Sequence, residues 1–247
     1  MIEETLNIAT QNGAMETFIV RPERGDPCPP VLFLMDAPGI REELHDMARR
    51  LATSGYCVLL PNLYYRNGRD TIHYGPDVLV KESKAWTRMR AIREKMTIPP
   101  VMEDIAAMFA YLDDHPAMAR PGNVGVHGYC MSGPYALAAA ARYPERIAAA
   151  ASFYGTWLVN DVEESPHLNL AKIAGEAYIA CAEIDDLAPL PMVAELQELF
   201  DAAGTKGEIE IYLGVHHGFG FPERSIYHKP AAERHWERLI ALYQRNL

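Results

Sequence analysis

The sequence predicts an α/β protein built on a mostly parallel, twisted sheet with helices on both faces. Two patterns carry this prediction. Short, continuously apolar runs, such as Val31 to Met35 and Tyr56 to Leu60, indicate strands that are buried on both faces. Longer segments with apolar residues at helical spacing lie between these runs. Strands that alternate with helices favour parallel pairing, with the helices covering the sheet.

The chain opens with a predicted antiparallel hairpin at the edge of the sheet. Residues 2–9 and 14–20 flank Asn12-Gly13, a dipeptide suited to the positive φ angles of a tight turn. The strand 31–35 follows, and then a helix that Gly55 is placed to end. The apolar face of this helix consists of Ile40, Leu44, Met47, Ala48 and Leu51.

The same alternation continues to the C-terminus, without an internal repeat or linker, so we expect a single domain over residues 1–247. Residues 64–98 are the least regular part and are candidates for loops or a helical excursion over the active site. The further predicted elements are a helix at 100–114, a strand at 123–128, a helix at 131–142, strands at 147–153 and 176–182, a helix at 191–203, a strand at 208–213 and a helix at 230–246.

Composition narrows the possible partners and location. The formal net charge of −10 disfavours binding to nucleic acid or anionic lipid, and no apolar run approaches the roughly 20 residues of a membrane span. The start Met1-Ile2-Glu3-Glu4 has neither a basic nor an apolar signal region, so we expect a cytoplasmic protein. The four cysteines form no C-x-x-C pair, which argues against a zinc knuckle or a thioredoxin-like motif.

The most informative segment is the strand-to-helix turn at Gly128-Tyr129-Cys130-Met131-Ser132-Gly133. A residue on such a sharp turn projects above the sheet in a strained backbone conformation, which is the arrangement of a catalytic nucleophile. Gly128 and Ser132, two residues before and two after Cys130, are small enough to avoid a clash where the chain folds back. Gly133 keeps the helix close to the sheet.

This position suits Cys130 for nucleophilic chemistry. The N-terminus of the following helix favours thiolate over thiol, and the amide N–H of Met131 is placed to stabilise an oxyanion. The alternative is a buried structural cysteine at a strand–helix junction. Ser132 is a rival nucleophile, but it lies further into the helix and lacks a small residue two places before it, so we interpret it as packing or support.

A thiol nucleophile needs a base, and the base needs an orienting acceptor. In hydrolases with this turn, an acid and then a histidine follow the nucleophile on loops after later strands. Asp185 and His217 match that order and placement. Their neighbours leave ambiguities: we expect Asp186 to cap a turn, and His216 to point away from the site. A metal site at the two histidines is a weak alternative, since no other ligands come at a recognisable spacing.

With these residues in place, the chain resembles the dienelactone hydrolase family of the α/β-hydrolase fold from about residue 15 to the C-terminus. The residues that carry the resemblance are the Cys130 turn, the segment from Gly55 to Tyr64 leading to Arg66, and His217-Gly218-Phe219. The resemblance implies a Cys-His-Asp triad at Cys130, His217 and Asp185. Asp185 is preferred partly because the family's acid lies four residues before a proline, which is Pro189 here. The resemblance also implies cleavage of cyclic or activated esters through a thioester, without a cofactor.

Three departures from the family pattern concern the substrate and the thiol. Asp36 stands where family members carry a glutamate associated with holding the resting thiol, although the amide of the next residue, Ala37, remains available as a second oxyanion donor. Phe221 stands where dienelactone-specific members carry a carboxylate-binding arginine, and Arg224 lies nearby. Ser132 replaces a glycine, a small-for-small change that we expect to be harmless.

Aromatic residues could line a more apolar pocket, although each is individually more typical of packing. They are Tyr64, Tyr65, Tyr74, Trp86, Phe219 and Phe221.

These features predict a hydrolase of a small ester or lactone, acting as a monomer or small homo-oligomer. Substrates with good leaving groups suit the predicted chemistry, because thiolate leaves a tetrahedral intermediate more readily than an alkoxide or an amide nitrogen. The alternatives are a non-catalytic binding or sensor protein on the same fold, and a redox-regulated protein that uses Cys130. The latter lacks a resolving cysteine nearby in sequence.

Overall fold

The computed structural model describes residues 1–23, 26–67 and 76–247. The chain divides into two compact units, Met1–Pro121 and Gly122–Leu247. Each unit is described by itself below, and the expectation of one domain over the whole chain stays a prediction.

The first unit contains a mixed sheet, whose described strands follow the order β1-β2-β4-β3. Strand β2 pairs antiparallel with both β1 and β4, whereas β3 and β4 are parallel. The predicted N-terminal antiparallel hairpin is therefore confirmed. The described elements are β1 (Ile2–Thr10), β2 (Gly13–Arg21), β3 (Pro30–Leu34), α1 (Glu42–Thr53), β4 (Cys57–Pro61), the 3₁₀ turns Tyr65–Asn67 and Pro76–Leu79, α2 (Lys84–Arg93) and α3 (Ile98–Asp114).

The hairpin turn lies one residue earlier than expected. Gln11 and Asn12 form the turn, and Thr10 pairs directly with Gly13. Of the expected dipeptide, Gly13 alone has a positive φ, 133°, because its lack of a side chain permits this backbone conformation where β2 begins.

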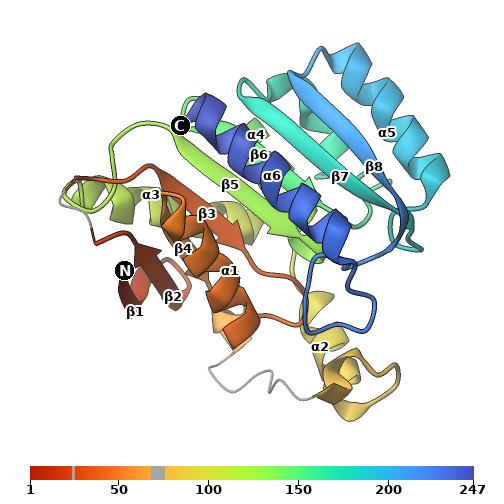
Figure 1. Ribbon diagram of the computed structural model, residues 1–247, viewed down its shortest axis with the longest axis horizontal. Coiled ribbons are helices and arrows are strands. Elements are labelled where there is room, and N and C mark those ends of the chain that lie inside the picture. Colours follow the sequence, from red (N-terminus) through yellow and green to blue (C-terminus); the bar gives the residue numbers. More distant parts are fainter. Residues whose placement is uncertain (24–25, 68–75) are drawn as a thin grey trace. The chain divides into compact units, whose positions relative to one another are not determined.

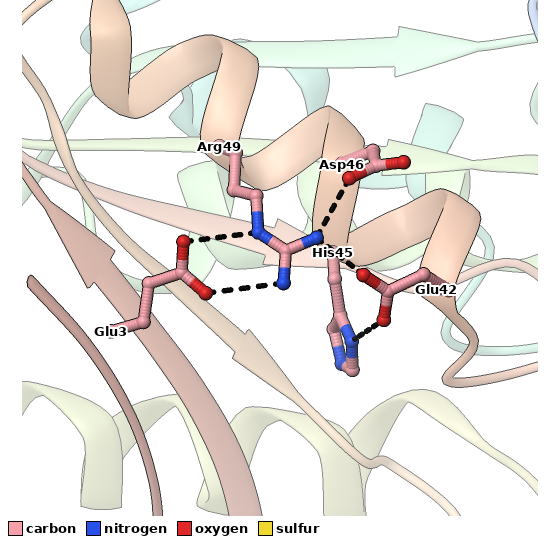
Figure 2. Close-up of polar contacts among 5 residues, drawn as sticks. All are labelled: Glu3, Glu42, His45, Asp46 and Arg49. Carbon is pink, nitrogen blue, oxygen red and sulfur yellow. Dashed lines mark hydrogen bonds and ion pairs between the residues drawn. The ribbon is translucent and has the colours of Figure 1, made fainter. Parts of the chain in front are cut away.

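Helix α1 covers β2 and β4 with the apolar face that its spacing predicts. Leu44, Met47 and Leu51 are buried, and the helix ends just before Gly55, whose φ of 103° turns the chain into β4. On its outer side Arg49 contacts Glu3 of β1 and also Glu42 and Asp46 (Figure 2). Exposed ion pairs of this kind contribute little to stability.

The second unit, every residue of which is described, contains a sheet of four strands in the order β5-β6-β7-β8. All neighbouring strands in it are parallel (Figure 1). The elements are β5 (Val124–Tyr129), the 3₁₀ turn Cys130–Ser132, α4 (Gly133–Arg142), β6 (Ile147–Phe153), the 3₁₀ helix Pro166–Lys172, β7 (Glu176–Ile184), α5 (Leu190–Ala203), β8 (Gly207–His216) and α6 (Lys229–Asn246).

Helices cover both faces of this sheet, as the alternation of side chains in β5 demonstrates. His127 and Tyr129 contact Tyr243 and His235 of α6. The intervening Gly128 closely approaches the turn that leads into α4. Because successive side chains of a strand point to opposite faces, α4 and α6 lie on opposite sides. The predicted mostly parallel sheet with helices on both faces is thus confirmed.

The largest difference from the predicted boundaries is at the end of β8. This strand continues to His216, three residues beyond the predicted end at 213, and a register shift in its pairing with β7 precedes its last residues. His217 is therefore the first residue after the strand. In the described part of the chain, no helix is both long and apolar enough to cross a membrane.

Candidate active site

Cys130 lies in a strained turn between β5 and α4. Its φ is 54°, in the left-handed region that costs a residue other than glycine about 1–2 kcal/mol. An added Cβ on Gly128 would lie 2.1 Å from the carbonyl oxygen of Ser132, and one on Gly133 would lie 2.4 Å from Oγ of Ser152. The two glycines therefore allow the chain to fold back tightly at Cys130.

The helix predicted to begin at residue 131 begins two residues later, after a tighter turn. Residues Cys130–Ser132 form a 3₁₀ turn, and the α-helix begins at Gly133. Cys130 is not part of a disulfide and has an exposed fraction of 7%, while Met131 and Ser132 are buried. The buried hydroxyl of Ser132 is therefore less accessible to a substrate than the thiol.

His217 and Asp185 contact each other at the carboxyl ends of neighbouring strands. Nδ1 of His217 lies 2.7 Å from Oδ2 of Asp185, whose side chain is fully buried. The backbone N–H of His217 donates to the carbonyl of Ile184, which fixes the two loops together. The carboxylate thus holds the ring in the tautomer with hydrogen on Nδ1 and leaves Nε2 available to accept a proton.

Asp185 also performs the turn-capping role that we expected of Asp186. Its Oδ1 accepts the backbone N–H of Leu187 at 2.8 Å, whereas Asp186 is exposed. The expectation that Asp186 caps the turn while Asp185 orients the histidine was wrong, because the two oxygens of the Asp185 carboxylate face two different donors. Of the two histidines, His216 is exposed at the end of β8.

The electrostatic environment of His217 links it to Cys130. Burial lowers the pKa of His217, but the negative charge and hydrogen bonding of Cys130, together with the hydrogen bond and charge of Asp185, raise this pKa to about 10. Nε2 of His217 is buried and has no hydrogen-bond partner of regular geometry among the residues that the structure describes. The interactions with Cys130 and Asp185 therefore favour the protonated form of His217.

The aromatic residues after His217 pack behind it. Phe219 and Phe221 are fully buried, and both contact the ring of Tyr154, which lies edge-on against the ring of His217 at a centroid distance of 5.2 Å. Phe219 and Phe221 therefore pack as expected of individual aromatic residues, and their role at the substrate stays a prediction. Arg224 stacks over the Phe221 ring at 4.3 Å.

The remaining predicted residues belong to the first unit. Asp36 is fully buried and forms two hydrogen bonds with Arg41, at 2.6 and 3.2 Å, and Arg41 also binds Glu43. The hydroxyl of Tyr64 donates to the carbonyl of Ala37 at 2.8 Å. Tyr64 therefore fixes the Ala37–Pro38 peptide. Tyr74 lies outside the described residues.

Sequence reasoning missed Tyr154 and Trp157, in the loop after β6. Both have positive φ angles, 39° and 49°. Their backbone strain has no signature in the sequence, but their location after a buried strand, between the strands that carry Cys130 and Asp185, could have indicated them. Among the described residues, no group of three or more His, Cys, Asp or Glu side chains is arranged to hold a metal ion.

Comparisons with known proteins identify the family of this chain. The model of the dienelactone hydrolase family matches residues 15–247. A protein of Escherichia coli O157:H7 named "Putative carboxymethylenebutenolidase" is 27% identical, with 96% of this chain and 85% of the relative covered. A Bradyrhizobium protein named "Probable 2-oxo-3-(5-oxofuran-2-ylidene)propanoate lactonase" is 25% identical, with 95% and 91% covered.

The fold also matches a solved structure. The crystal structure titled "Putative Dienelactone Hydrolase" from Klebsiella pneumoniae has a TM-score of 0.85 and 24% sequence identity, and the match covers 98% of each chain. This likeness extends over nearly the whole chain and concerns the fold.

Proposed function

Because this chain belongs to the dienelactone hydrolase family, we propose that it hydrolyses a small ester or lactone with Cys130 as nucleophile, His217 as base and Asp185 as orienting acid. One observation carries the proposal: His217 contacts the Asp185 carboxylate through Nδ1 and is electrostatically coupled to Cys130. The names of the curated relatives support a lactone as substrate.

The proposed reaction has two stages. The thiolate of Cys130 attacks the substrate carbonyl, and the amide N–H groups of Met131 and Ala37 stabilise the oxyanion. Collapse of the tetrahedral intermediate releases the alcohol or enol, to which the His217 imidazolium gives its proton, and leaves a thioester. His217 then takes a proton from water, which attacks the thioester and frees the acid and Cys130.

The geometry supports a division of roles within the second unit. The strained turn presents Cys130 at the carboxyl end of β5, while Asp185 and His217 follow β7 and β8. These positions support the proposed triad, because parallel strands bring their carboxyl ends to one edge of the sheet.

Arg224 is the candidate residue for binding a substrate that carries a carboxylate. Arg224 packs on Phe221 and is partly exposed, so it could reach a substrate carboxylate from a different position than the arginine of dienelactone-specific members. A lactone panel with and without a carboxylate tests this. A preference for carboxylate lactones that Arg224→Gln removes would support it, and equal rates would contradict it.

The central test compares Cys130→Ala and His217→Gln with the control Cys181→Ala, using p-nitrophenyl acetate. Cys181 is a buried cysteine on β7, and burial raises its pKa to about 12, so its thiol is inert. We expect losses in kcat of at least about 10³-fold for the first two variants. Equal rates in all four proteins would refute the triad and favour a non-catalytic binding protein.

Location and assembly remain predictions. None of the four cysteines, all of which are described, forms a disulfide, which is compatible with the expected reducing cytoplasm. Fractionation of the host cell and sedimentation of the purified protein would test the cytoplasmic location and the expected monomer or small homo-oligomer.

A further inference from the structure

Trp157 has a backbone conformation that a tryptophan rarely adopts. The described residues other than glycine with a positive φ are Glu82, Cys130, Tyr154 and Trp157. The last three belong to the second unit: Cys130 is the candidate nucleophile, the ring of Tyr154 contacts that of His217, and Trp157 lies three residues after Tyr154. Conformations of this kind are costly for residues with a Cβ and persist where neighbouring structure enforces them, which is common at functional sites.

Hydrogen bonds on both sides of Trp157 enforce this conformation. Its backbone N–H donates to the carbonyl of Leu187 at 3.0 Å, and its own carbonyl accepts the side-chain amide of Asn160 at 2.6 Å. The preceding residue, Thr156, donates its backbone N–H to the carbonyl of Cys130 at 3.1 Å. Trp157 is therefore attached to the turn of the candidate nucleophile and to the loop of the candidate acid.

The indole is exposed although the surrounding aromatic side chains are buried. Trp157 has an exposed fraction of 43%, compared with 0% for Tyr154 and 4% for Trp236. Leaving a large apolar ring in water gains little for folding. The strain in the backbone is thus unfavourable for stability and the exposed side chain adds little to it, and both occur within one residue of the contact to Cys130.

We propose that Trp157 is a specificity-determining residue, whose indole forms an apolar stacking surface for the planar, unsaturated part of the substrate. This inference rests on the proposed ester or lactone hydrolysis and adds the residue that selects planar groups of the substrate over saturated ones. A flat ring on a fixed backbone loses little conformational freedom when a planar group stacks on it.

The test measures kcat/KM for two matched substrate pairs in wild type, Trp157→Gly and Trp157→Phe. One pair varies the acyl group, 2,2,2-trifluoroethyl benzoate against the cyclohexanecarboxylate. The other varies the alcohol, phenyl acetate against trifluoroethyl acetate. Each variant-to-wild-type ratio cancels the intrinsic reactivity of the substrate.

We expect Trp157→Gly to lower the preference for the planar member of at least one pair by about 10-fold, and Trp157→Phe to retain most of it. Leu213→Ala, which shortens an exposed side chain on β8, is the control and should leave both preferences unchanged. Unchanged preferences in Trp157→Gly for both pairs would overturn the inference.

A second readout separates specificity from a structural role. Glycine adopts a φ of 49° without strain, so Trp157→Gly should melt at the same temperature as wild type or higher. A clear fall in the melting temperature would overturn the inference in favour of packing. Activity retained in Cys130→Ala would contradict the proposed function itself. An inactive Cys130→Ala together with unchanged preferences in Trp157→Gly would contradict the specificity role alone.

Discussion

Nδ1 of His217 and Oδ2 of Asp185 lie 2.7 Å apart, and the second oxygen of the same carboxylate accepts the backbone N–H of Leu187. Both oxygens of the Asp185 carboxylate therefore have a partner. This fixes the orientation of the carboxylate relative to the imidazole of His217. The first prediction concerns this contact.

Asp185→Asn should lower kcat by about 10²- to 10⁴-fold, because an amide that turns its NH₂ toward Nδ1 favours the wrong histidine tautomer. Stopped-flow or steady-state hydrolysis of p-nitrophenyl acetate measures the effect. Asp186→Asn is the matched control, since Asp186 is exposed, and it should retain the wild-type rate. The opposite outcome, with Asp186→Asn inactive, would reassign the acid.

The stability of the fold should fall at alkaline pH. The pKa of His217 is raised to about 10 in the folded chain, where burial opposes and Cys130 and Asp185 favour the charged form, against about 6.5 in the unfolded chain. The stabilisation is therefore fully present below pH 6.5 and is lost as the pH rises through about 10.

Urea unfolding between pH 8 and 10.5 tests this expectation. The free energy of unfolding of wild type should fall by at least about 1 kcal/mol more than that of His217→Gln, because one pKa unit corresponds to about 1.4 kcal/mol. Parallel curves for the two proteins would show that His217 is not charged in the folded state.

Gly128→Ala should disrupt the turn at Cys130. The added methyl group would lie 2.1 Å from the Ser132 carbonyl oxygen, a backbone atom that cannot move aside without displacing the start of α4. We expect a loss of several kcal/mol in stability, or failure to fold, together with loss of activity. Ala136→Gly in the buried part of α4 is a milder control and should cost about 1 kcal/mol. Thermal unfolding of both variants measures the difference.

The buried ion pair of the first unit should matter far more than the exposed cluster in Figure 2. Arg66 binds both oxygens of the buried Asp104 at 2.8 Å, and burial raises the pKa of Asp104. Arg66→Ala should destabilise the fold by about 3 kcal/mol, since it leaves a carboxylate in the interior without its cation.

Arg49→Ala, by contrast, should cost less than about 1 kcal/mol, because Arg49 pairs with exposed acidic residues in contact with water. Equal losses in Arg66→Ala and Arg49→Ala would contradict this ranking. Chemical denaturation of the two variants at neutral pH provides the comparison.

The order of elements could be predicted from the sequence because apolar runs and helical spacing reflect burial directly. The turn at Cys130 was also visible, since Gly128 and Gly133 mark a close approach of the backbone. The dual contacts of Asp185 were not, because two adjacent aspartates have the same residue type and only the folded loop determines which one is buried. The strain at Trp157 was likewise hidden, since φ is imposed by hydrogen bonds from distant residues.

Cys130, Asp185 and His217 all belong to the segment from Gly122 to the C-terminus, and each follows a different parallel strand. The three proposed catalytic side chains are thus encoded in one contiguous half of the sequence, whereas Ala37, the proposed second oxyanion donor, lies in the other half. Substitutions in residues 1–121 that keep the backbone at Ala37 in place therefore alter none of the three side chains.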